Sequence, residues 1–180
     1  MLTEEDLVRG CLNKDRVSEA ELYKRYAARL YALCIRYSSD RESARDLMHD
    51  AMIKALGALG SFTYSGEGSL YAWLRRLTVN LAIDRIRRRK VKLLSLGNVQ
   101  EPPEEGIEEV TEIPVAVLQG MISSLPEERR AIFNMFCIDG YSHKEIAKAF
   151  GISEKGSASI LAKARAQLRR EIKDYLMKNE

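Results

Sequence analysis

The sequence predicts an all-α protein of two small helical domains joined by a flexible acidic linker, with a helix-turn-helix in the C-terminal domain. Two observations lead to this prediction. Apolar residues recur at helical rather than alternating spacing along almost the whole chain, and one internal segment is rich in proline and glutamate. Of the 180 residues, 46% are apolar and 31% charged, so the chain can form a core and is not expected to be globally disordered.

The expected linker lies in the middle of the chain. From Gly97 to Pro114 the sequence contains paired prolines and clustered glutamates, with no apolar side chains at helical spacing. This composition favours an extended, flexible segment. We therefore expect a first helical domain over residues 1–92, a flexible acidic linker over 93–117 and a helix-turn-helix domain over 118–180.

The net charge of +3 is unevenly distributed. Residues 1–90 contain 17 Lys and Arg against 12 Asp and Glu, residues 91–119 one Lys against six Glu, and residues 120–180 contain 11 against 8. Two basic blocks around an acidic segment suggest two modules that face nucleic acid. Two helical domains with ordinary solvated faces would give the same counts, so charge leaves both interpretations open.

The composition also argues against several functional classes. No apolar run approaches the length of a bilayer span and the N-terminus is too acidic for a signal peptide, so we expect a cytoplasmic protein without direct membrane insertion. Cys11, Cys34 and Cys137 are scattered and odd in number, and we expect them to be reduced and mostly buried. His49 and His143 have no cysteine at ligand spacing, so no metal and no cofactor is expected.

Three amphipathic helices are expected in the first domain, over residues 18–38, 42–59 and 70–90. The sequence Ser-Ser-Asp at 38–40 supplies capping side chains between the first two. The core faces that we expect are Leu22, Tyr26, Leu30 and Leu33 in the first helix, Ala44, Leu47, Ala51 and Ala55 in the second, and Leu70, Trp73, Leu74, Leu77 and Leu81 in the third.

A polar and aromatic loop precedes the third helix. Phe62 and Tyr64 lie in this loop, and the helix after it presents Arg76 and Asn80 before it ends in a basic run. Single-stranded nucleic acid is bound by aromatic faces and backbone-neutralising cations, and an unstacked base is recognised through its exposed edge. Each feature also has a structural explanation: Trp73 as a core anchor, the loop aromatics as cover for the core edge, and the arginines as a solvated helix end.

The second domain contains the pattern of a helix-turn-helix. Ala147 is a small residue where two helices would cross, Gly151 permits a left-handed turn, and Ser153 can cap the next helix. Residues 155–159 then form the helix start that would reach base edges in a major groove, and cations suited to phosphates follow. Helical hairpins with glycine turns are common, so the pattern alone also fits a scaffold without a DNA role.

In their order and separation these motifs resemble the extracytoplasmic-function (ECF) group of bacterial sigma factors, which carry conserved regions 2 and 4. The resemblance covers nearly the whole chain. Region 2 is represented by DLMHDAMIKAL, which begins at Asp46, and by YAWLRRLTVNLAIDRIRRR, which begins at Tyr71. Region 4 is represented by LPEERRAIFNMFCIDGYSHKEIAKAFGISEKGSASILAKARAQLR, which begins at Leu125.

The resemblance implies a sigma factor and not an enzyme. Such a protein binds core RNA polymerase and directs promoter recognition, DNA melting and transcription initiation. The implied partners are core RNA polymerase, promoter DNA and an anti-sigma factor, which in this group is often membrane-anchored and would hold the protein at the inner membrane; no small-molecule substrate is implied. The acidic linker would thread toward the active-site and RNA-exit channel of the polymerase and mimic nucleic acid there.

The resemblance also implies site residues. The polymerase clamp would contact Asp46, Leu47, His49, Asp50 and Lys54. The minus-ten element would be bound by Ser61, Phe62, Thr63, Tyr64, Trp73, Arg76, Asn80, Arg87 and Arg88. The minus-thirty-five element would be bound by Lys155, Gly156, Ser157, Ser159, Lys163 and Arg165. The sequence departs from the family pattern at His49, where glutamine is usual, and at Ala158 and Ile160, where basic residues are common.

Three alternatives fit parts of the same sequence. A helix-turn-helix transcriptional regulator that is not a polymerase subunit would usually carry a strand–helix sensor domain, and no strand pattern precedes the second domain. A site-specific recombinase would need an activated Ser or Tyr among arginines, but Tyr23, Tyr26 and Tyr31 lie on or beside the predicted core face. A helical scaffold would leave Arg76 and Asn80 unexplained.

Overall fold

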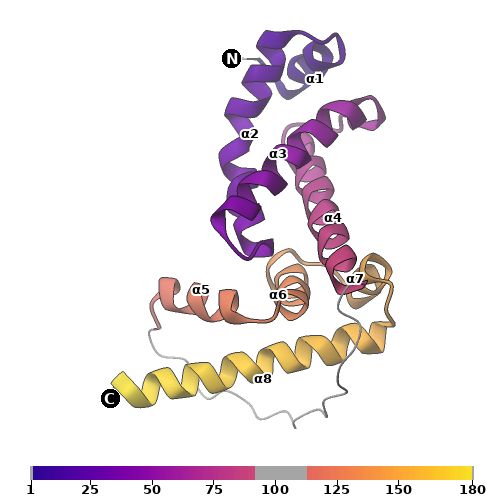
Figure 1. Cartoon of the computed structure of the whole chain (residues 1–180). Helices are drawn as coiled ribbons and strands as arrows, with labels where there is room; N and C mark the ends of the chain where they lie inside the picture. Colours follow the sequence, from indigo (N-terminus) through magenta and orange to yellow (C-terminus); the bar gives the residue numbers. More distant parts are fainter. Residues whose placement is uncertain (1, 92–112, 180) are drawn as a thin grey trace. The chain divides into compact units, whose positions relative to one another are not determined.

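The computed structural model describes residues 2–91 and 113–179, and every regular element within these ranges is helical (Figure 1). The predicted all-α class is therefore confirmed. The chain divides into two compact units, Met1–Arg85 and Ile86–Glu180. Residues 93–112, most of the predicted linker, lie outside the described residues. The last residues of the predicted linker are described, and the helix α5 already begins among them, at Val115.

The first unit contains four helices and a short turn. These are α1 (Glu4–Leu12), α2 (Arg16–Tyr37), α3 (Arg41–Ala58), the 3-10 turn η1 (Leu59–Ser61) and α4 (Ser69–Val91), which continues past the unit boundary. Figure 1 shows α2, α3 and α4 as the long helices of this unit. Consecutive helices pack against each other: α1 on α2, and α2 on α3.

Polar caps set the starts of the first three helices. The Asp40 carboxylate accepts a hydrogen bond of 2.7 Å from the Ser43 backbone N–H, which confirms the predicted cap of α3. Asp15 caps α2 in the same way. The sequence analysis did not predict α1. Its signal is the cap Thr3, which accepts from Asp6 N at 3.0 Å, followed by an acidic first turn.

The core of the first unit confirms two of the three predicted faces. All the predicted residues of α2 and α3 are buried. The face predicted for α4 is only partly right: Leu70 and Leu74 are buried, but Leu77 and Leu81 are half-buried and Val79 and its neighbours Ala82 and Ile83 replace them. The prediction placed Leu77 and Leu81 in the core because leucine is hydrophobic. Which side of α4 is buried depends instead on the helices that pack against it.

The second unit contains the remaining helices. These are α5 (Val115–Ser124), α6 (Glu127–Phe133), the π-helical turn η2 (Asn134–Ile138), α7 (His143–Phe150) and α8 (Glu154–Asn179). The helices α5, α6 and α7 all pack on α8, which is the long helix at the bottom of Figure 1. One buried cluster joins Leu125, Ala164 and Leu168, with Met121, Ile122 and Phe133 packed against it.

The predicted helix-turn-helix is formed by α7, a tight turn and α8. A capping box between Ser142 and Glu145 starts α7. The helix ends at Gly151, whose φ of 68° is left-handed, so the predicted role of this glycine is confirmed. Ser153 Oγ then accepts from Gly156 N at 2.9 Å and caps α8. Ala147 is buried, as predicted for a helix crossing.

Two of the three cysteines have the predicted environment. Cys11 and Cys34 are buried, and this burial raises the pKa of Cys11 to about 11 and that of Cys34 to about 12. Both thiols are therefore protonated at neutral pH. Cys137 is the exposed exception, near the end of η2.

Candidate nucleic-acid interface

The outer face of α3 carries four of the five predicted polymerase contacts. Asp46, His49, Asp50 and Lys54 are all exposed there. Arg85 of α4 donates a hydrogen bond to the Asp50 carboxylate. This pair fixes the acidic side chain at the edge of the face.

Two apolar residues of this face were missed by the sequence analysis. Ile53 of α3 is 70% exposed although it is a large aliphatic side chain. Tyr23 of α2 stacks on His49, with ring centroids 6.1 Å apart. The sequence signal for Ile53 is its position on the polar side of an amphipathic helix, where an exposed apolar side chain suggests a contact with a partner.

Leu47 does not belong to this exposed face. Its side chain is 2% exposed and lies in the core with Ala44 and Ala51. The helical period explains the correction: Leu47 lies on one side of α3 with Ala44 and Ala51, whereas Asp46 and Asp50 each precede a member of that buried set by one residue and are rotated about 100° from it. Leu47 therefore supports α3 from inside and does not itself reach a partner.

The predicted minus-ten residues that precede α4 begin at Ser61, the last residue of η1. Ser61 is exposed and its hydroxyl donates to Ala58 O at 2.7 Å. Phe62 is half-buried and packs against the half-buried Trp73 of α4, with ring centroids 5.4 Å apart and planes tilted by 51°. The interpretation of Trp73 as a core anchor and of Phe62 as cover for the core edge is thus correct in part, since the two rings pack on each other. Both also keep exposed surface.

The second half of the loop is shaped by glycines and by Ser69. Gly66 and Gly68 have φ values of 116° and 90°, which side chains rarely adopt. The Ser69 hydroxyl donates to Gly66 O at 2.6 Å. Thr63 is exposed and Tyr64 half-buried. Partial loss of water and the carboxylates of Glu67, Glu4 and Glu5 raise the pKa of Tyr64, so its phenol stays neutral at physiological pH.

A line of polar residues leaves this loop along α4. Trp73, Arg76, Asn80 and Asp84 follow each other at spacings of three and four residues, so they share one side of the helix. Arg76 and Asn80 are exposed. Arg87 continues the same spacing and is exposed, whereas the exposed Arg88 is rotated about 100° from Arg87. Arg88 follows Asp84 by four residues and therefore lies at the edge of this line rather than along its centre.

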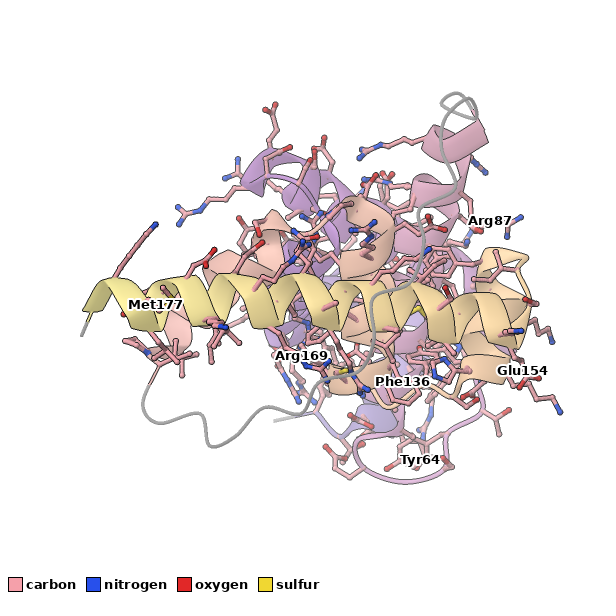
Figure 2. All side chains as sticks on the ribbon, turned by 90° about the horizontal axis from the view of Figure 1, so that it is seen from below. Tyr64, Arg87, Phe136, Glu154, Arg169 and Met177 are labelled. Carbon is pink, nitrogen blue, oxygen red and sulfur yellow. The ribbon has the colours of Figure 1, made fainter. Side chains whose placement is uncertain are left out.

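The first turns of α8 bring together part of the predicted minus-thirty-five set. Lys155, Ser159 and Lys163 follow at four-residue steps on the side opposite the buried residues Leu161 and Ala164. Lys155 is exposed and the other two are half-buried. Figure 2 shows α8 along its whole length, from Glu154 at its start to Met177 near its end.

Gly156 has a local structural reason. A Cβ atom at this position would lie 3.2 Å from Ser153 Oγ, tighter than an ordinary contact. Because Ser153 caps the helix through the Gly156 N–H, a larger residue would press on the cap. The sequence analysis attributed no such role to this glycine.

Two predicted members of the set lie elsewhere. Ser157 has no exposed surface, and its hydroxyl is hydrogen-bonded to His143 Nδ1 of α7 at 2.9 Å. It therefore joins the two helices and does not face a ligand. The Arg165 side chain is exposed, and its guanidinium lies beside η2, 5.8 Å from the Phe136 ring and with a hydrogen bond of 3.8 Å to Cys137 Sγ. Phe136 is labelled beside α8 in Figure 2.

Within the described ranges 2–91 and 113–179, the structure has neither a metal-ligating cluster nor a membrane-spanning helix. No group of three or more His, Cys, Asp or Glu side chains there could hold a metal ion. None of the helices in these ranges is both long enough and apolar enough to cross a membrane.

Comparison with known proteins identifies both modules. Residues 22–91 match the family described as Sigma-70 region 2, and residues 116–168 match Sigma-70, region 4. The chain is 33% identical over 156 residues to the ECF RNA polymerase sigma factor SigM of Mycobacterium tuberculosis, which covers 87% of this chain and 78% of SigM. It is 31% identical over 166 residues to SigE of Mycolicibacterium smegmatis, covering 88% of this chain and 62% of SigE.

A solved structure has the same fold. It is the sigma factor RpoE in complex with the anti-sigma factor NepR from Bartonella quintana, with a TM-score of 0.54 and 21% identity over 86% of this chain and 96% of that chain. Two helical modules with a region 2 and a region 4 define a sigma factor. The chain belongs to the ECF RNA polymerase sigma factors. It directs promoter recognition together with RNA polymerase, and the alternative of a regulator that is not a polymerase subunit is not favoured.

Proposed function

We propose that this sigma factor opens promoter DNA by holding an unstacked base of the minus-ten element at the loop before α4. The observation that carries the proposal is the continuity of the loop with the polar line of α4, from Trp73 through Arg76 to Asn80. Capture of a flipped base offsets an unstacking cost of about a few kcal/mol. Thr63 and Tyr64 would bound the base, and Arg76, Asn80, Arg87 and Arg88 would follow the strand, with Ser61, Phe62 and Trp73 supporting the loop.

Region 4 is proposed to bind the minus-thirty-five element through the start of α8. Lys155, Ser159 and Lys163 form the face that would enter the major groove, with Gly156 allowing a close approach. Arg165, exposed beside Phe136, would add a phosphate contact at the edge of this face. Each good base contact adds about 1–3 kcal/mol of discrimination.

The polymerase is proposed to dock on the outer face of α3. Asp46, His49, Asp50 and Lys54 supply the polar contacts, and Ile53 and Tyr23 supply an apolar centre between them. A partly apolar patch rimmed by charges is the usual composition of a protein interface. In this arrangement residues 1–92 act as region 2, residues 118–180 as region 4, and residues 93–117 as the acidic linker that enters the polymerase channel.

The remaining proposals concern partners and location. The protein has no catalytic task of its own, no cofactor and no small-molecule substrate, because the polymerase performs the chemistry. An anti-sigma factor is proposed as an inhibitory partner, supported by the complex of RpoE with NepR that shares this fold. The protein is proposed to act in the cytoplasm, with the anti-sigma factor holding it at the inner membrane.

Run-off transcription tests the proposal. Core RNA polymerase from the source bacterium is incubated with fragmented genomic DNA, with and without this protein. We expect new discrete transcripts that start downstream of a shared two-part motif, and permanganate-reactive thymines at the minus-ten element. Transcripts without permanganate reactivity would contradict base capture by the loop, and failure of the polymerase to bind the protein would contradict the α3 interface.

A further inference from the structure

One buried carboxylate of the first unit is not explained by the proposed contacts. Glu4 of α1 is 2% exposed. Its Oε1 accepts a hydrogen bond of 2.7 Å from the Tyr26 hydroxyl, and its Oε2 accepts from the backbone N–H groups of Gly68 at 2.9 Å and Leu70 at 3.3 Å. Glutamate is rarely buried unless its oxygens are paired. An ionised carboxylate, which only accepts, satisfies all three donors.

These three bonds join parts of the chain that are far apart in sequence. Gly68 ends the loop of the proposed minus-ten site, and Leu70 belongs to the first turn of α4. The first N–H groups of a helix have no partner within the helix, and negative charge is favourable beside them. Glu4 therefore caps α4 from a distance of 64 and 66 residues along the chain.

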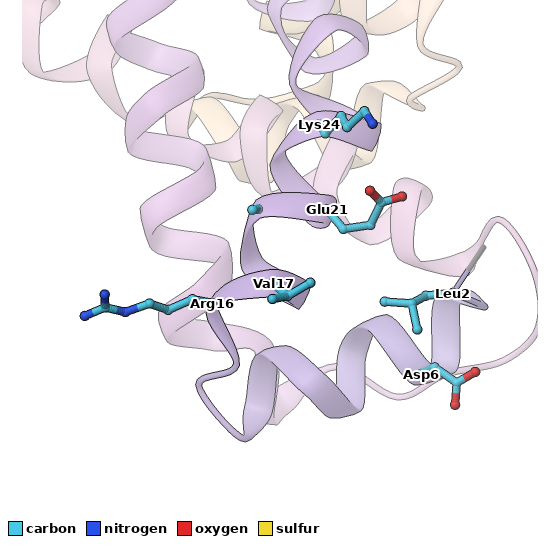
Figure 3. Close-up of a pocket in the computed structure, with 7 residues that line it drawn as sticks. Leu2, Asp6, Arg16, Val17, Glu21 and Lys24 are labelled. Carbon is cyan, nitrogen blue, oxygen red and sulfur yellow. The ribbon is translucent and has the colours of Figure 1, made fainter.

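The helix that carries Glu4 is itself firmly held. Arg25 of α2 donates to Leu2 O at 2.8 Å just before α1 begins. A Cβ atom on Gly10 would lie 2.0 Å from Ser18 Oγ, so this glycine lets α1 approach α2 closely. Figure 3 shows the side chain of Leu2, just before α1, pointing toward Val17 of α2 across a hollow that Leu2, Asp6, Val17 and Glu21 help to line.

The same helix also contacts the other end of the loop. α1 packs on η1, the turn that precedes Phe62. Residues 62–68 are thus supported at both ends by α1: at η1 through packing, and at Gly68 through the Glu4 carboxylate. Between these supports, Gly66 and Gly68 have positive φ, and only a fixed environment selects such a conformation from the many open to glycine.

We propose that Glu4 is a positioning residue for the minus-ten loop, and that α1 presets the loop in the conformation that captures the base. The inference rests on the proposed role of this loop. Without the carboxylate, the N–H groups of Gly68 and Leu70 lose their acceptor and the loop end gains alternative conformations. The loop must then become ordered before it can bind the base. The apparent affinity for the base is lowered in proportion to the fraction of protein whose loop is already in the binding conformation.

A pair of adjacent glutamates makes the test specific. Glu4→Gln and Glu5→Gln each remove one negative charge near the loop, which by electrostatics alone would favour DNA binding. Only Glu4 is buried, since Glu5 is exposed. Holoenzymes of both variants are titrated with a fluorescent single-stranded oligonucleotide that carries the minus-ten sequence found by run-off transcription. Glu4→Gln leaves one amide oxygen for the three donors and turns an NH2 donor toward the others, which predicts an oligonucleotide affinity about tenfold lower for this variant, against the electrostatic direction.

Glu5→Gln is expected to bind at least as tightly as the wild type, and both variants to bind core polymerase normally. Equal oligonucleotide affinity of the two variants would overturn the inference while leaving base capture intact. Failure of the wild-type holoenzyme to bind the oligonucleotide would instead contradict the proposed function of the loop.

Two measurements on the free protein do not depend on DNA. Trp73 is the one tryptophan of the chain and packs against Phe62, so its quenching by acrylamide reports loop opening. We expect stronger quenching in Glu4→Gln than in Glu5→Gln at equal helicity. Native-state hydrogen exchange of the wild type is expected to protect the amides of Gly68 and Leu70. Rapid exchange at both amides in the folded wild type would overturn the inference even if Glu4→Gln failed to fold.

Discussion

His143 of α7 and Ser157 of α8 are joined by a hydrogen bond of 2.9 Å between the imidazole Nδ1 and the hydroxyl. The imidazole also stacks on Phe136 of η2, with ring centroids 4.4 Å apart. One histidine thereby links the two helices of the helix-turn-helix to the element packed behind them. The start of α8 is thus tied to α7 through the buried Ser157 and the half-buried His143 and Phe136.

The first prediction compares two serines of α8. Ser157→Ala removes the hydrogen-bond partner of the half-buried His143 imidazole, so we expect a loss of about 1 kcal/mol in the free energy of unfolding. Ser159→Ala, on the opposite side of the helix, is expected to leave stability within about 0.5 kcal/mol. Urea unfolding of both variants measures the difference. Equal unfolding midpoints would contradict the structural role of Ser157.

The second prediction separates the cations of α8. Lys163→Ala removes a charge from the proposed DNA face and is expected to reduce the slope of log affinity against log salt by about 1. Arg165→Ala should change this slope less, because its guanidinium lies against Phe136 and Cys137. Holoenzyme binding to a minus-thirty-five duplex, titrated over a range of salt, provides the measurement. A larger slope change for Arg165→Ala would reverse the assignment.

The third prediction concerns the apolar centre of the α3 face. Ile53→Asp places a charge where we propose contact with the polymerase, and we expect affinity for core polymerase to fall by about tenfold, or about 1.4 kcal/mol. Ile35→Asp is the matched control, because Ile35 is also exposed, at 44%, but lies more than three turns of α2 beyond Tyr23 and outside the proposed face. Competition for core polymerase against the wild-type protein measures both. The interface is misplaced if the two variants compete equally well.

The fourth prediction is a pH dependence at the cap of α3. Hydrogen bonds from the Ser43 backbone N–H and from the Ser39 and Ser43 hydroxyls lower the pKa of Asp40 below its ordinary value of 3.8. The pKa of Asp40 is lower in the folded state than in the unfolded chain. The cap therefore stabilises the fold fully at a pH above the unfolded-state pKa, and this stabilisation is lost as the pH falls through the folded-state pKa.

Asp40→Asn keeps a capping side chain but does not titrate, so the fall in unfolding midpoint on acidification should become shallower. Asp46→Asn, on the same helix but away from its cap, is the control. Urea midpoints from neutral pH to well below 3.8 test the difference. Identical acid limbs for wild type and Asp40→Asn would show that the cap carries no pH-dependent stability.

Features set by near neighbours in the chain were predictable. The three long helices of the first unit, the cap Asp40, the left-handed Gly151 and the cap Ser153 were all predicted from residues within one or two turns. The physical reason is that helix periodicity, capping and glycine turns depend on local hydrogen bonds and side-chain spacing. The class of protein also followed from the sequence, since both modules are confirmed by comparison.

Only the tertiary structure decided which side chains are available for contact. Leu47 and Ser157 lie within predicted binding motifs but are buried. Ile53, which was not among the predicted contacts, is exposed on the face that carries the polar ones. The support of the loop by Glu4 joins residues 64 positions apart, and no local pattern contains it. Burial and long-range hydrogen bonds depend on which helix packs opposite, and this is determined by the whole core rather than by any segment alone.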